Sequence, residues 1–332
     1  MSSSATAHAQ RPLRLCILGL GAVGQRMLEQ AAIHPHFEVV CGFDPSPQAR
    51  QQALSLAPHL RCSDSAAASL DANDIDAVYV AAPPLYHAEL VRQCMARRLP
   101  VLCEKPLGVD LADSQALCQE MRASGLPQAV NFVFASAPAV GVLAQRLKAP
   151  DFALQQVFIR LHFHQWPRPF QAHAAWLSGA AQGGFTREVS SHFIYLLQRL
   201  LGPVHIEHAQ IKRNGPADAE QQLSALLRAG DIPVTLLSTT GGQTPEIVQA
   251  EFMVRAQTLA LRDWYSLWLS DAQHPQGTAL VNAADARMQT YQAQLDQWRA
   301  ALQGQPHSLP DFEQALQVQT TIETLLRTPP QP

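Results

Sequence analysis

Lysine is nearly absent from this sequence of 332 residues. Of the 24 basic residues only Lys105, Lys148 and Lys212 are lysines, and the other 21 (24 minus three) are arginines. An arginine cannot supply the compact ammonium, the three rotatable donors or the movable pKa of a lysine. Lys105, in the tripeptide Glu104-Lys105-Pro106, is therefore the first candidate for chemistry. The alternative is an exposed lysine without a role, which we expect for Lys148 and Lys212.

The chain also lacks an excess of charge of either sign. Its 24 basic and 27 acidic residues give a formal net charge of −3. Such a chain has no global field that would attract nucleic acid or an anionic membrane surface, and we expect neither partner. No apolar run approaches the roughly 18 residues of a membrane span.

Cysteine is confined to the first 120 residues, and none of the six cysteines has the C-x-x-C spacing of a zinc or redox site. Several lie in apolar runs such as Leu15-Cys16-Ile17, where a free thiol behaves as a small buried hydrophobe. This usage favours a reducing, cytoplasmic compartment. Residues 1–12 are polar and lack the apolar segment of a signal peptide, so we expect a flexible N-terminal arm.

From residue 13 to residue 137 short apolar runs alternate with helical stretches, which is typical of βαβ units. Right-handed crossovers between such units build a doubly wound parallel sheet, so this part is predicted to be an α/β Rossmann domain. The predicted strands are 13–19, 37–43, 77–81, 101–103 and 128–134, and the predicted helices are 23–33, 47–56, 86–98 and 111–124.

The second part, residues 138–332, is predicted to be an α+β domain. Consecutive strand-like runs joined by short turns indicate a large, mostly antiparallel sheet. A hydrophobic content of 47% is enough for a core in each domain. The predicted strands are 154–164, 205–211, 222–227, 234–238, 247–254 and 258–264, and the predicted helices are 140–147, 186–201 and a closing helix at about 311–325, which can return to the first domain.

Three glycines, Gly19, Gly21 and Gly24, form a G-x-G-x-x-G motif between the first predicted strand and helix. In a dinucleotide site they allow the tight turn, the close approach of the pyrophosphate and the packing of helix on strand, and the helix N-terminus with Ala22 and Val23 favours the anion. The alternative is a glycine turn that binds nothing.

Asp44 ends the second predicted strand, 20 residues after Gly24, where a ribose acceptor belongs. A carboxylate there bonds the free hydroxyls of NAD and repels a 2′-phosphate, so NAD is favoured over NADP, although Arg50 could swing in to bind that phosphate.

Several motifs in the same order and spacing make the chain resemble the Gfo/Idh/MocA family, the glucose-fructose oxidoreductase and inositol dehydrogenase group. The matching segments are the glycine turn, Ala82-Pro83-Pro84-Leu85-Tyr86-His87, Val101-Leu102-Cys103-Glu104-Lys105-Pro106, Gly183-Gly184 followed by Glu188 and His192, and Asp311-Phe312-Glu313-Gln314-Ala315-Leu316.

The resemblance implies a role for each matched residue. It places Lys105 beside the nicotinamide and against the substrate oxygen, and it makes His192 the catalytic histidine. It places Ala82, Pro83, His87 and Glu104, together with Lys105, at the cofactor. It also implies a cis peptide bond between Lys105 and Pro106, because the free-energy cost of the cis form is small before proline.

Glu188 and His192 lie four residues apart on a predicted helix and can therefore touch. A carboxylate there would orient the imidazole and raise its pKa, which suits a group that takes and returns a proton near neutrality. The family usually has aspartate at this position, and the longer Glu188 could instead reach the substrate. Taken alone, His192 also fits an ordinary half-buried histidine.

The substrate side is predicted to include Trp166, Arg168 and Trp176, besides Lys105 and His192. The tryptophans could stack on a ring and Arg168 could hold a carboxylate, or the aromatic residues could only cap the core between the domains. His162 and His164 could share one face of a strand, but without a nearby carboxylate or cysteine no metal site is predicted. Many sugar-handling members carry an arginine near Val133, and its absence departs from that pattern.

These features predict an NAD(P)-dependent oxidoreductase that moves hydride between nicotinamide and a carbinol or carbonyl carbon of a small polar, sugar-like or cyclic metabolite. One alternative is reduction of an imine or enamine on the same scaffold. Another is a non-catalytic NAD(P)-binding sensor or regulator, against which the retention of Lys105 and His192 argues. By resemblance, the antiparallel sheet has an open face that pairs between subunits, so we expect a homodimer or homotetramer.

Overall fold

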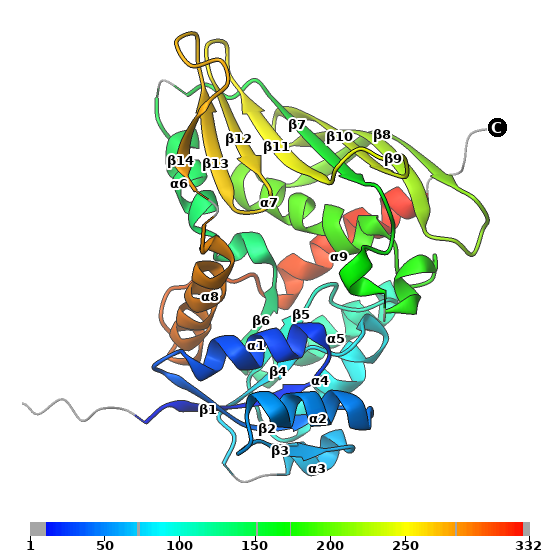
Figure 1. The fold of residues 1–332 in the computed structure, drawn as a ribbon, viewed down its shortest axis with the longest axis vertical. Helices are drawn as coiled ribbons and strands as arrows, with labels where there is room; N and C mark the ends of the chain where they lie inside the picture. The colour runs from blue at the N-terminus through cyan, green and yellow to red at the C-terminus, as the bar shows by residue number, and fades with distance from the viewer. Residues whose placement is uncertain (1–10, 72–73, 151, 173, 283, 328–332) are drawn as a thin grey trace, which may run out of the picture.

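The computed structural model describes residues 11–71, 74–150, 152–172, 174–282 and 284–327 (Figure 1). Most of the N-terminal arm predicted over residues 1–12 lies outside these described residues. The described chain forms two sheets with helices between and around them, as the ribbon in Figure 1 shows. None of the described helices combines the length and the apolarity that a membrane crossing requires.

The first sheet has six parallel strands in the order β3-β2-β1-β4-β5-β6. Its central strands are continuous apolar runs because helices cover both faces. The strands are β1 (Leu13–Leu18), β2 (Phe37–Phe43), β3 (Arg61–Ser63), β4 (Ala77–Val80), β5 (Val101–Glu104) and β6 (Gln128–Asn131). The connecting helices are α1 (Ala22–Ala32), α2 (Pro47–Leu56), α3 (Ala66–Leu70), α4 (His87–Ala96) and α5 (Leu111–Ser124). Strand β3 and helix α3 were not predicted, because they are too short to show a period.

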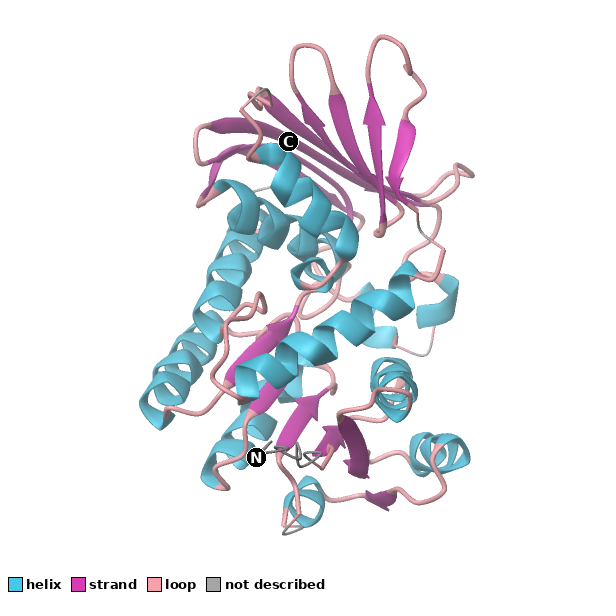
Figure 2. Ribbon diagram, turned by 90° about the vertical axis from the view of Figure 1, so that its left-hand side faces the viewer, coloured by secondary structure: helices cyan, strands magenta, loops and turns pink. Residues whose placement is uncertain are grey.

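The second sheet has eight strands in the order β14-β13-β12-β11-β7-β10-β9-β8. All neighbours are antiparallel except β7 and β10, which are parallel. Burial alternates along β7, β9, β10 and β11, because one face packs on helices and the other is more open. In Figure 2 the helices lie below this sheet, on the side of the parallel sheet. The strands are β7 (Gln156–Phe163), β8 (Val204–Arg213), β9 (Glu220–Ala229), β10 (Ile232–Thr240), β11 (Ile247–Met253), β12 (Thr258–Arg262), β13 (Ser266–Ser270) and β14 (Thr278–Val281).

The helices of the second half differ from the prediction in two places. The predicted helix 186–201 is a π-helical turn, Thr186–Ser190, followed by α7 (Ser191–Leu201). Helix α8 (Ala286–Leu302) was not predicted, because its buried side mixes polar Thr290 and Gln294 with apolar residues and shows no clean apolar period. The remaining helices are α6 (Pro138–Leu147) and α9 (Phe312–Leu326).

Helix α9 connects the two halves. It packs against α5 of the first half and α7 of the second. The Pro310 carbonyl, just before α9, accepts the Val130 N–H at 2.9 Å, and Gln128 Oε1 accepts the Phe312 N–H at 2.7 Å. The closing segment therefore continues the hydrogen bonding of β6 beyond the sheet edge, while the division at residue 137 stays a prediction.

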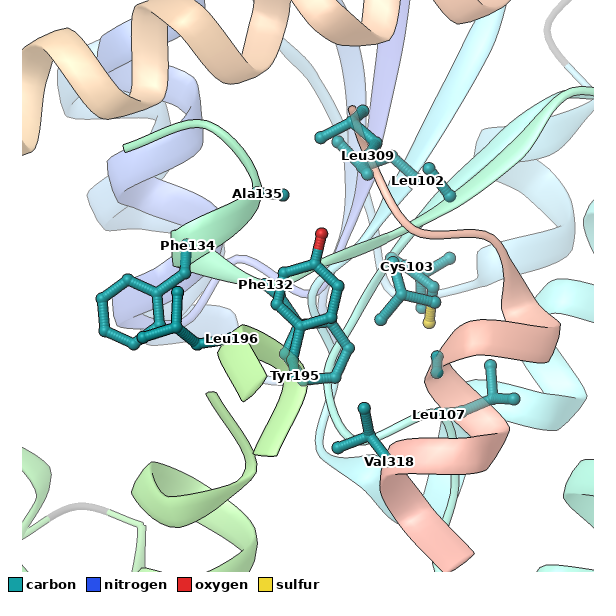
Figure 3. Packing of buried hydrophobic residues seen from close by; sticks show 14 of the residues in the cluster. Leu102, Cys103, Leu107, Phe132, Phe134, Ala135, Tyr195, Leu196, Leu309 and Val318 are labelled. Atoms are coloured by element: carbon teal, nitrogen blue, oxygen red, sulfur yellow. The ribbon is translucent and has the colours of Figure 1, made fainter. Parts of the chain in front are cut away.

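The apolar core runs without a break beneath the region where the halves meet. Figure 3 shows Phe132 and Tyr195 lying face to face there, with Leu107 and Val318 on one side. The Phe132 and Tyr195 rings are stacked with centroids 4.7 Å apart. This packing fixes the start of α7 relative to the end of β6, and with them the side chains of the site described next.

Candidate active site

A cavity of about 1210 Å³ opens between the two halves. The glycine turn and Asp44 line one end, and Lys105, Glu188 and His192 line the other. Ligand sites commonly measure about 300–1,000 Å³, so this one is large enough for a dinucleotide together with a small molecule. The cavity brings together the predicted cofactor and catalytic residues from distant parts of the chain.

The glycine turn has the geometry that close approach of a ligand requires. Gly19 has φ +104°, a conformation that glycine adopts without strain, and a Cβ on Gly24 would lie 1.9 Å from the Gly19 carbonyl oxygen. A Cβ on Gly21 would meet nothing within 4 Å, since this residue faces the cavity. Helix α1 then begins without a side-chain cap. Its first N–H groups, at Ala22 and Val23, are therefore left for an anion such as a pyrophosphate.

Asp44 lies directly after β2 and lines the same end of the cavity. Its carboxylate accepts the N–H groups of Leu20 and Ser46, both at 2.8 Å. A carboxylate has further lone pairs, so acceptor capacity remains for ribose hydroxyls. Arg50 Nη1 donates to the backbone carbonyls of Asp44 (2.7 Å) and Pro45 (3.1 Å), which holds this guanidinium close to the Asp44 backbone.

Lys105 follows β5 at the opposite end, where the Lys105-Pro106 peptide bond is cis. Its ammonium donates to Glu188 Oε2 at 2.5 Å and to the Glu188 backbone carbonyl at 2.9 Å. The side chain is only 8% exposed, and it lines the cavity. An ammonium carries three N–H donors, so one donor remains for a ligand.

His192, in the first turn of α7, is buried among aromatic rings. The ring centroids of Phe132, Phe134 and Trp264 lie 5.7, 6.2 and 5.5 Å from its own. Its Nδ1 is buried without a hydrogen-bond partner among the described residues. Burial, followed by the positive charges of Lys105 and Arg168, holds the pKa of His192 well below its usual value.

The prediction that Glu188 raises the pKa of His192 is therefore wrong. That prediction assumed a regular α-helix over 186–201, whereas Thr186–Ser190 is a π-helical turn with a different angular offset between side chains. The two Glu188 carboxylate oxygens are instead occupied by Lys105 and by Gln171 Nε2, which donates at 3.0 Å.

Glu104 lies behind Lys105 in a buried network. Tyr79 Oη and Asn131 Nδ2 both donate to Glu104 Oε1, the latter at 2.5 Å. Burial raises the pKa of Glu104 above its ordinary value. The network anchors the end of β5 to β4 and β6, so the strand end that carries Lys105 is held from both sides.

His87, predicted to bind cofactor, does not line the cavity. It is fully buried, with Nε2 2.7 Å from the Ala82 carbonyl oxygen and Nδ1 2.8 Å from that of Pro106. Burial lowers its pKa. Ala82 and Pro83 do line the cavity, so His87 supports their loop from behind and ties it to the turn that follows Lys105.

Of the predicted substrate residues, Arg168 and Trp176 line the cavity and Trp166 does not. Trp166 Nε1 donates to the Leu177 carbonyl at 3.0 Å, and its ring packs on Phe163 with centroids 5.3 Å apart. Trp166 therefore belongs to the aromatic core beneath the site. The spacing of residues along an irregular segment does not show in which direction their side chains point.

Several cavity residues were missed by the sequence analysis. Arg287 and Tyr291 come from α8, which was not predicted, and no sequence signal pointed to them. Arg26 Nη1 lies 3.5 Å from Tyr291 Oη, so α1 and α8 meet at the cavity. Gln171 lies between the predicted substrate residues Arg168 and Trp176 but was not predicted, and only the structure shows its link to Glu188.

His162 does not face a metal site. Its Nδ1 lies 2.9 Å from Thr239 Oγ1 on the neighbouring strand. Within the described ranges, no group of three or more histidine, cysteine, aspartate or glutamate side chains is arranged to hold a metal ion.

Comparison with known proteins agrees with this geometry. Residues 13–132 match the family model for the Gfo/Idh/MocA oxidoreductases with an NAD-binding Rossmann fold. The rhizopine catabolism protein MocA of Rhizobium meliloti is 33% identical over 103 residues, which are 31% of this chain and 32% of that protein. An inositol 2-dehydrogenase of Streptomyces avermitilis is 24% identical over 308 residues, covering 86% of this chain and 83% of that protein.

Solved structures share the whole fold. An oxidoreductase from Thermotoga maritima has a TM-score of 0.82 at 16% identity, covering 96% of each chain. A myo-inositol dehydrogenase from Corynebacterium glutamicum has a TM-score of 0.77 at 18% identity, covering 95% of this chain and 96% of the other. At these identities the likeness concerns the fold, and it confirms the predicted combination of a Rossmann sheet with a large, mostly antiparallel sheet.

Proposed function

This chain belongs to the Gfo/Idh/MocA family of oxidoreductases, and from that premise we propose that it is an NAD(P)-dependent dehydrogenase or reductase. Its reaction moves hydride between nicotinamide and a carbinol or carbonyl carbon of a small polar, sugar-like or cyclic metabolite. One observation carries the proposal: Lys105 and His192 line the same cavity as the glycine turn and Asp44.

The residues at one end of the cavity fit a dinucleotide. Gly19, Gly21 and the uncapped start of α1 would hold the pyrophosphate, and Asp44 would accept the ribose hydroxyls. When bound, the nicotinamide supplies or accepts the hydride. A carboxylate at Asp44 favours NAD over NADP because it repels a 2′-phosphate.

Lys105 stabilises negative charge on the substrate oxygen. Two of its donors are engaged by Glu188, which fixes the ammonium in place and leaves the third donor for that oxygen. During oxidation the oxygen gains negative charge as its proton leaves, and a preorganised cation stabilises that charge.

His192 moves the proton. Its lowered pKa keeps the imidazole neutral near pH 7, so it can accept a proton. In oxidation His192 would accept the proton of the substrate hydroxyl, and in reduction it would return that proton to the substrate oxygen. The aromatic rings around His192 keep competing water from its buried side.

We also propose an assembly and a location for the protein. The open face of the large sheet suits pairing with a second copy of this chain, giving a homodimer or homotetramer. The free cysteines, most of them buried, suit a reducing, cytoplasmic compartment.

Two other functions use the same cavity. Reduction of an imine or enamine needs the same cofactor position and a proton donor. A non-catalytic sensor needs neither Lys105 nor His192, and the network that holds Lys105 argues against that role.

The test is a screen for turnover with NADH and NAD, using sugars, inositols, hydroxy acids, ketones and cyclic imines. We expect a CH–OH or C=O compound to be turned over, and Lys105→Met to reduce kcat by orders of magnitude while NADH binding, followed by fluorescence, stays intact. Lys148→Met, at an exposed position, is the matched control. NADH binding without turnover of any compound would favour the sensor, and turnover of imines alone would favour imine reduction.

A further inference from the structure

Arg168 is a half-buried cation whose contacts with two acids, Glu188 and Glu246, are longer than hydrogen bonds. Its side chain is 12% exposed, and its Nε donates to Gln171 Oε1 at 2.9 Å. Within the described part of the chain, neither Nη1 nor Nη2 forms a hydrogen bond. The nearest carboxylate oxygens, Glu246 Oε1 and Glu188 Oε1, lie 3.7 and 3.9 Å away, beyond hydrogen-bond distance.

Glu188 is not free to satisfy Arg168. One of its carboxylate oxygens accepts from Lys105 and the other from Gln171. Gln171 is itself buried, and its amide oxygen already accepts from Arg168 Nε. The four side chains form one chain, Lys105–Glu188–Gln171–Arg168, and the terminal nitrogens of Arg168 make only the long contacts with Glu246 and Glu188.

Aromatic rings fix the Arg168 guanidinium in place. Its Cζ lies 4.7 Å from the centroid of the Phe170 ring, and 5.6 and 5.7 Å from those of Phe163 and Trp166. Rings stabilise a cation through their faces but accept no hydrogen bond of ordinary strength. The contacts of Nη1 and Nη2 with carboxylates are long, so both terminal nitrogens keep donor capacity for an anion that binds beside them.

A second arginine lines the same cavity. Arg287, near the start of α8, lines the cavity and lies over the Tyr265 ring at 5.9 Å. Among the described residues it has no acidic partner. Burial lowers the pKa of Arg168; the negative charges of Glu188 and Glu246 oppose this lowering, and the positive charge of Arg287 adds to it.

We propose that Arg168 and Arg287 form a carboxylate subsite, so that the substrate is a hydroxy acid of the aldonate or uronate kind. Nη1 and Nη2 of Arg168 present parallel donors that match the two oxygens of a carboxylate. Only the Glu188 carboxylate separates Lys105 from Arg168, so the anion lies a few carbon–carbon bonds from the reacting carbon.

The inference rests on the proposed function for the position of the reacting carbon, and it names the substrate class of that site. Binding and turnover therefore have to be measured separately. Calorimetry with the NADH-saturated enzyme reports the subsite whether or not hydride transfer occurs. Turnover with NAD or NADH reports the reaction.

The probes are matched pairs in which an amide replaces the carboxylate: D-gluconate with D-gluconamide, and D-glucuronate with D-glucuronamide. Glycerol phosphate tests whether the site prefers a phosphate. We expect at least one acid to bind at least tenfold more tightly than its amide. Arg168→Gln should reduce that preference by about 10- to 100-fold, as loss of charge-assisted hydrogen bonds does. Arg287→Gln should reduce it less, because this arginine is more exposed.

Arg146→Gln, on the exposed side of α6, removes the same charge away from the cavity and is the control. Equal binding of acids and amides, or an acid preference that survives Arg168→Gln, would overturn the carboxylate subsite. Glycerol phosphate binding more tightly than every acid would overturn the choice of carboxylate over phosphate. Acid binding without turnover of any probe would support the subsite and count against the proposed function instead.

Discussion

Lys105 and Glu188 form a direct ion pair, with Nζ 2.5 Å from Oε2, between the end of β5 and the turn that precedes α7. Glu188 was expected to orient His192 or to reach the substrate. The pair instead joins the cofactor half of the chain to the half that carries His192. Glu188 therefore positions the Lys105 ammonium through one carboxylate oxygen, and its other oxygen accepts a hydrogen bond from Gln171.

Replacing Glu188 by Gln should lower kcat/KM by about 10- to 100-fold, because a hydrogen bond between charged groups contributes about 1.5–3 kcal/mol. Glutamine can still accept from Lys105, but it removes the charge that fixes the ammonium. NADH affinity, measured by fluorescence, should change less than about twofold, since the glycine turn and Asp44 lie at the other end of the cavity.

Glu246→Gln is the matched control for this prediction. Glu246 has only a 3.7 Å contact with Arg168, so its loss should leave turnover of a neutral alcohol within about twofold. Near-normal kcat/KM in Glu188→Gln would show that the Lys105 pair has no part in turnover.

The parallel half of the fold could be predicted from the sequence because its buried strands are continuous apolar runs. The glycine motif then fixed the place of β1 and α1, and Asp44 fixed the end of β2. Short elements such as β3 carry too few residues to show a period. Helix α8 could not be predicted, because the polar residues Thr290 and Gln294 at its buried positions interrupt the apolar period.

The site was only partly predictable, for a physical reason. Lys105 and His192 belong to motifs whose spacing survives in the fold, and both line the cavity. Side-chain directions in irregular segments and at the first residue of a helix depend on local backbone geometry instead. His87 and Trp166 accordingly face away from the cavity, and a π-helical turn redirected Glu188.

His192 should make stability depend on pH below about 6.5. Its folded pKa lies well below that value, so at lower pH the unfolded chain binds the proton more readily than the folded protein. The free energy of unfolding is therefore unaffected by His192 above about pH 6.5. Below that pH it decreases, by at most about 1.4 kcal/mol per pH unit for this one group.

Urea unfolding of the wild type and His192→Gln, measured between pH 7.5 and about 5.5, checks this slope. The variant should lose less stability on acidification. His34 and His87, whose pKa values burial also lowers, remain in the variant and preserve part of the slope. His59→Gln, at an exposed position, is the control. Parallel curves for wild type and His192→Gln would contradict the lowered pKa.

Asp44→Ser should shift the cofactor preference toward NADP. Removing the carboxylate abolishes repulsion of the 2′-phosphate, and Arg50 already lies against the Asp44 backbone, ready to bind it. We expect the ratio of kcat/KM with NADP to that with NAD to rise at least about tenfold, the effect of roughly 1.4 kcal/mol. Some stability should also be lost, because the N–H groups of Leu20 and Ser46 bind different oxygens of Asp44 and serine has only one side-chain oxygen.

Glu38→Ser, at an exposed position of the same strand, removes a carboxylate without touching the cavity and is the matched control. An unchanged ratio in Asp44→Ser would mean that this carboxylate does not select the cofactor.

Breaking the buried ion pair between Arg187 and Glu323, at the junction of the π-helical turn and α9, should be strongly destabilising. Arg187 donates to both Glu323 oxygens, at 2.6 and 2.9 Å, and to the carbonyls of Ala180 and Gly183. Both side chains are only 9% exposed. Glu323→Gln would leave a buried guanidinium without its counter-charge, which costs about 3–5 kcal/mol of unfolding free energy.

Helix α9 supplies its own control for that prediction. Glu313 pairs with Arg122 at 2.6 Å, but the two side chains are 41% and 70% exposed. Such exposed pairs contribute about 0–1 kcal/mol, so Glu313→Gln should leave the urea midpoint almost unchanged. The double change Arg187→Met with Glu323→Leu should recover part of the loss, because no unpaired charge remains buried. Equal midpoint shifts for Glu323→Gln and Glu313→Gln would mean that burial does not set the strength of the Arg187 pair.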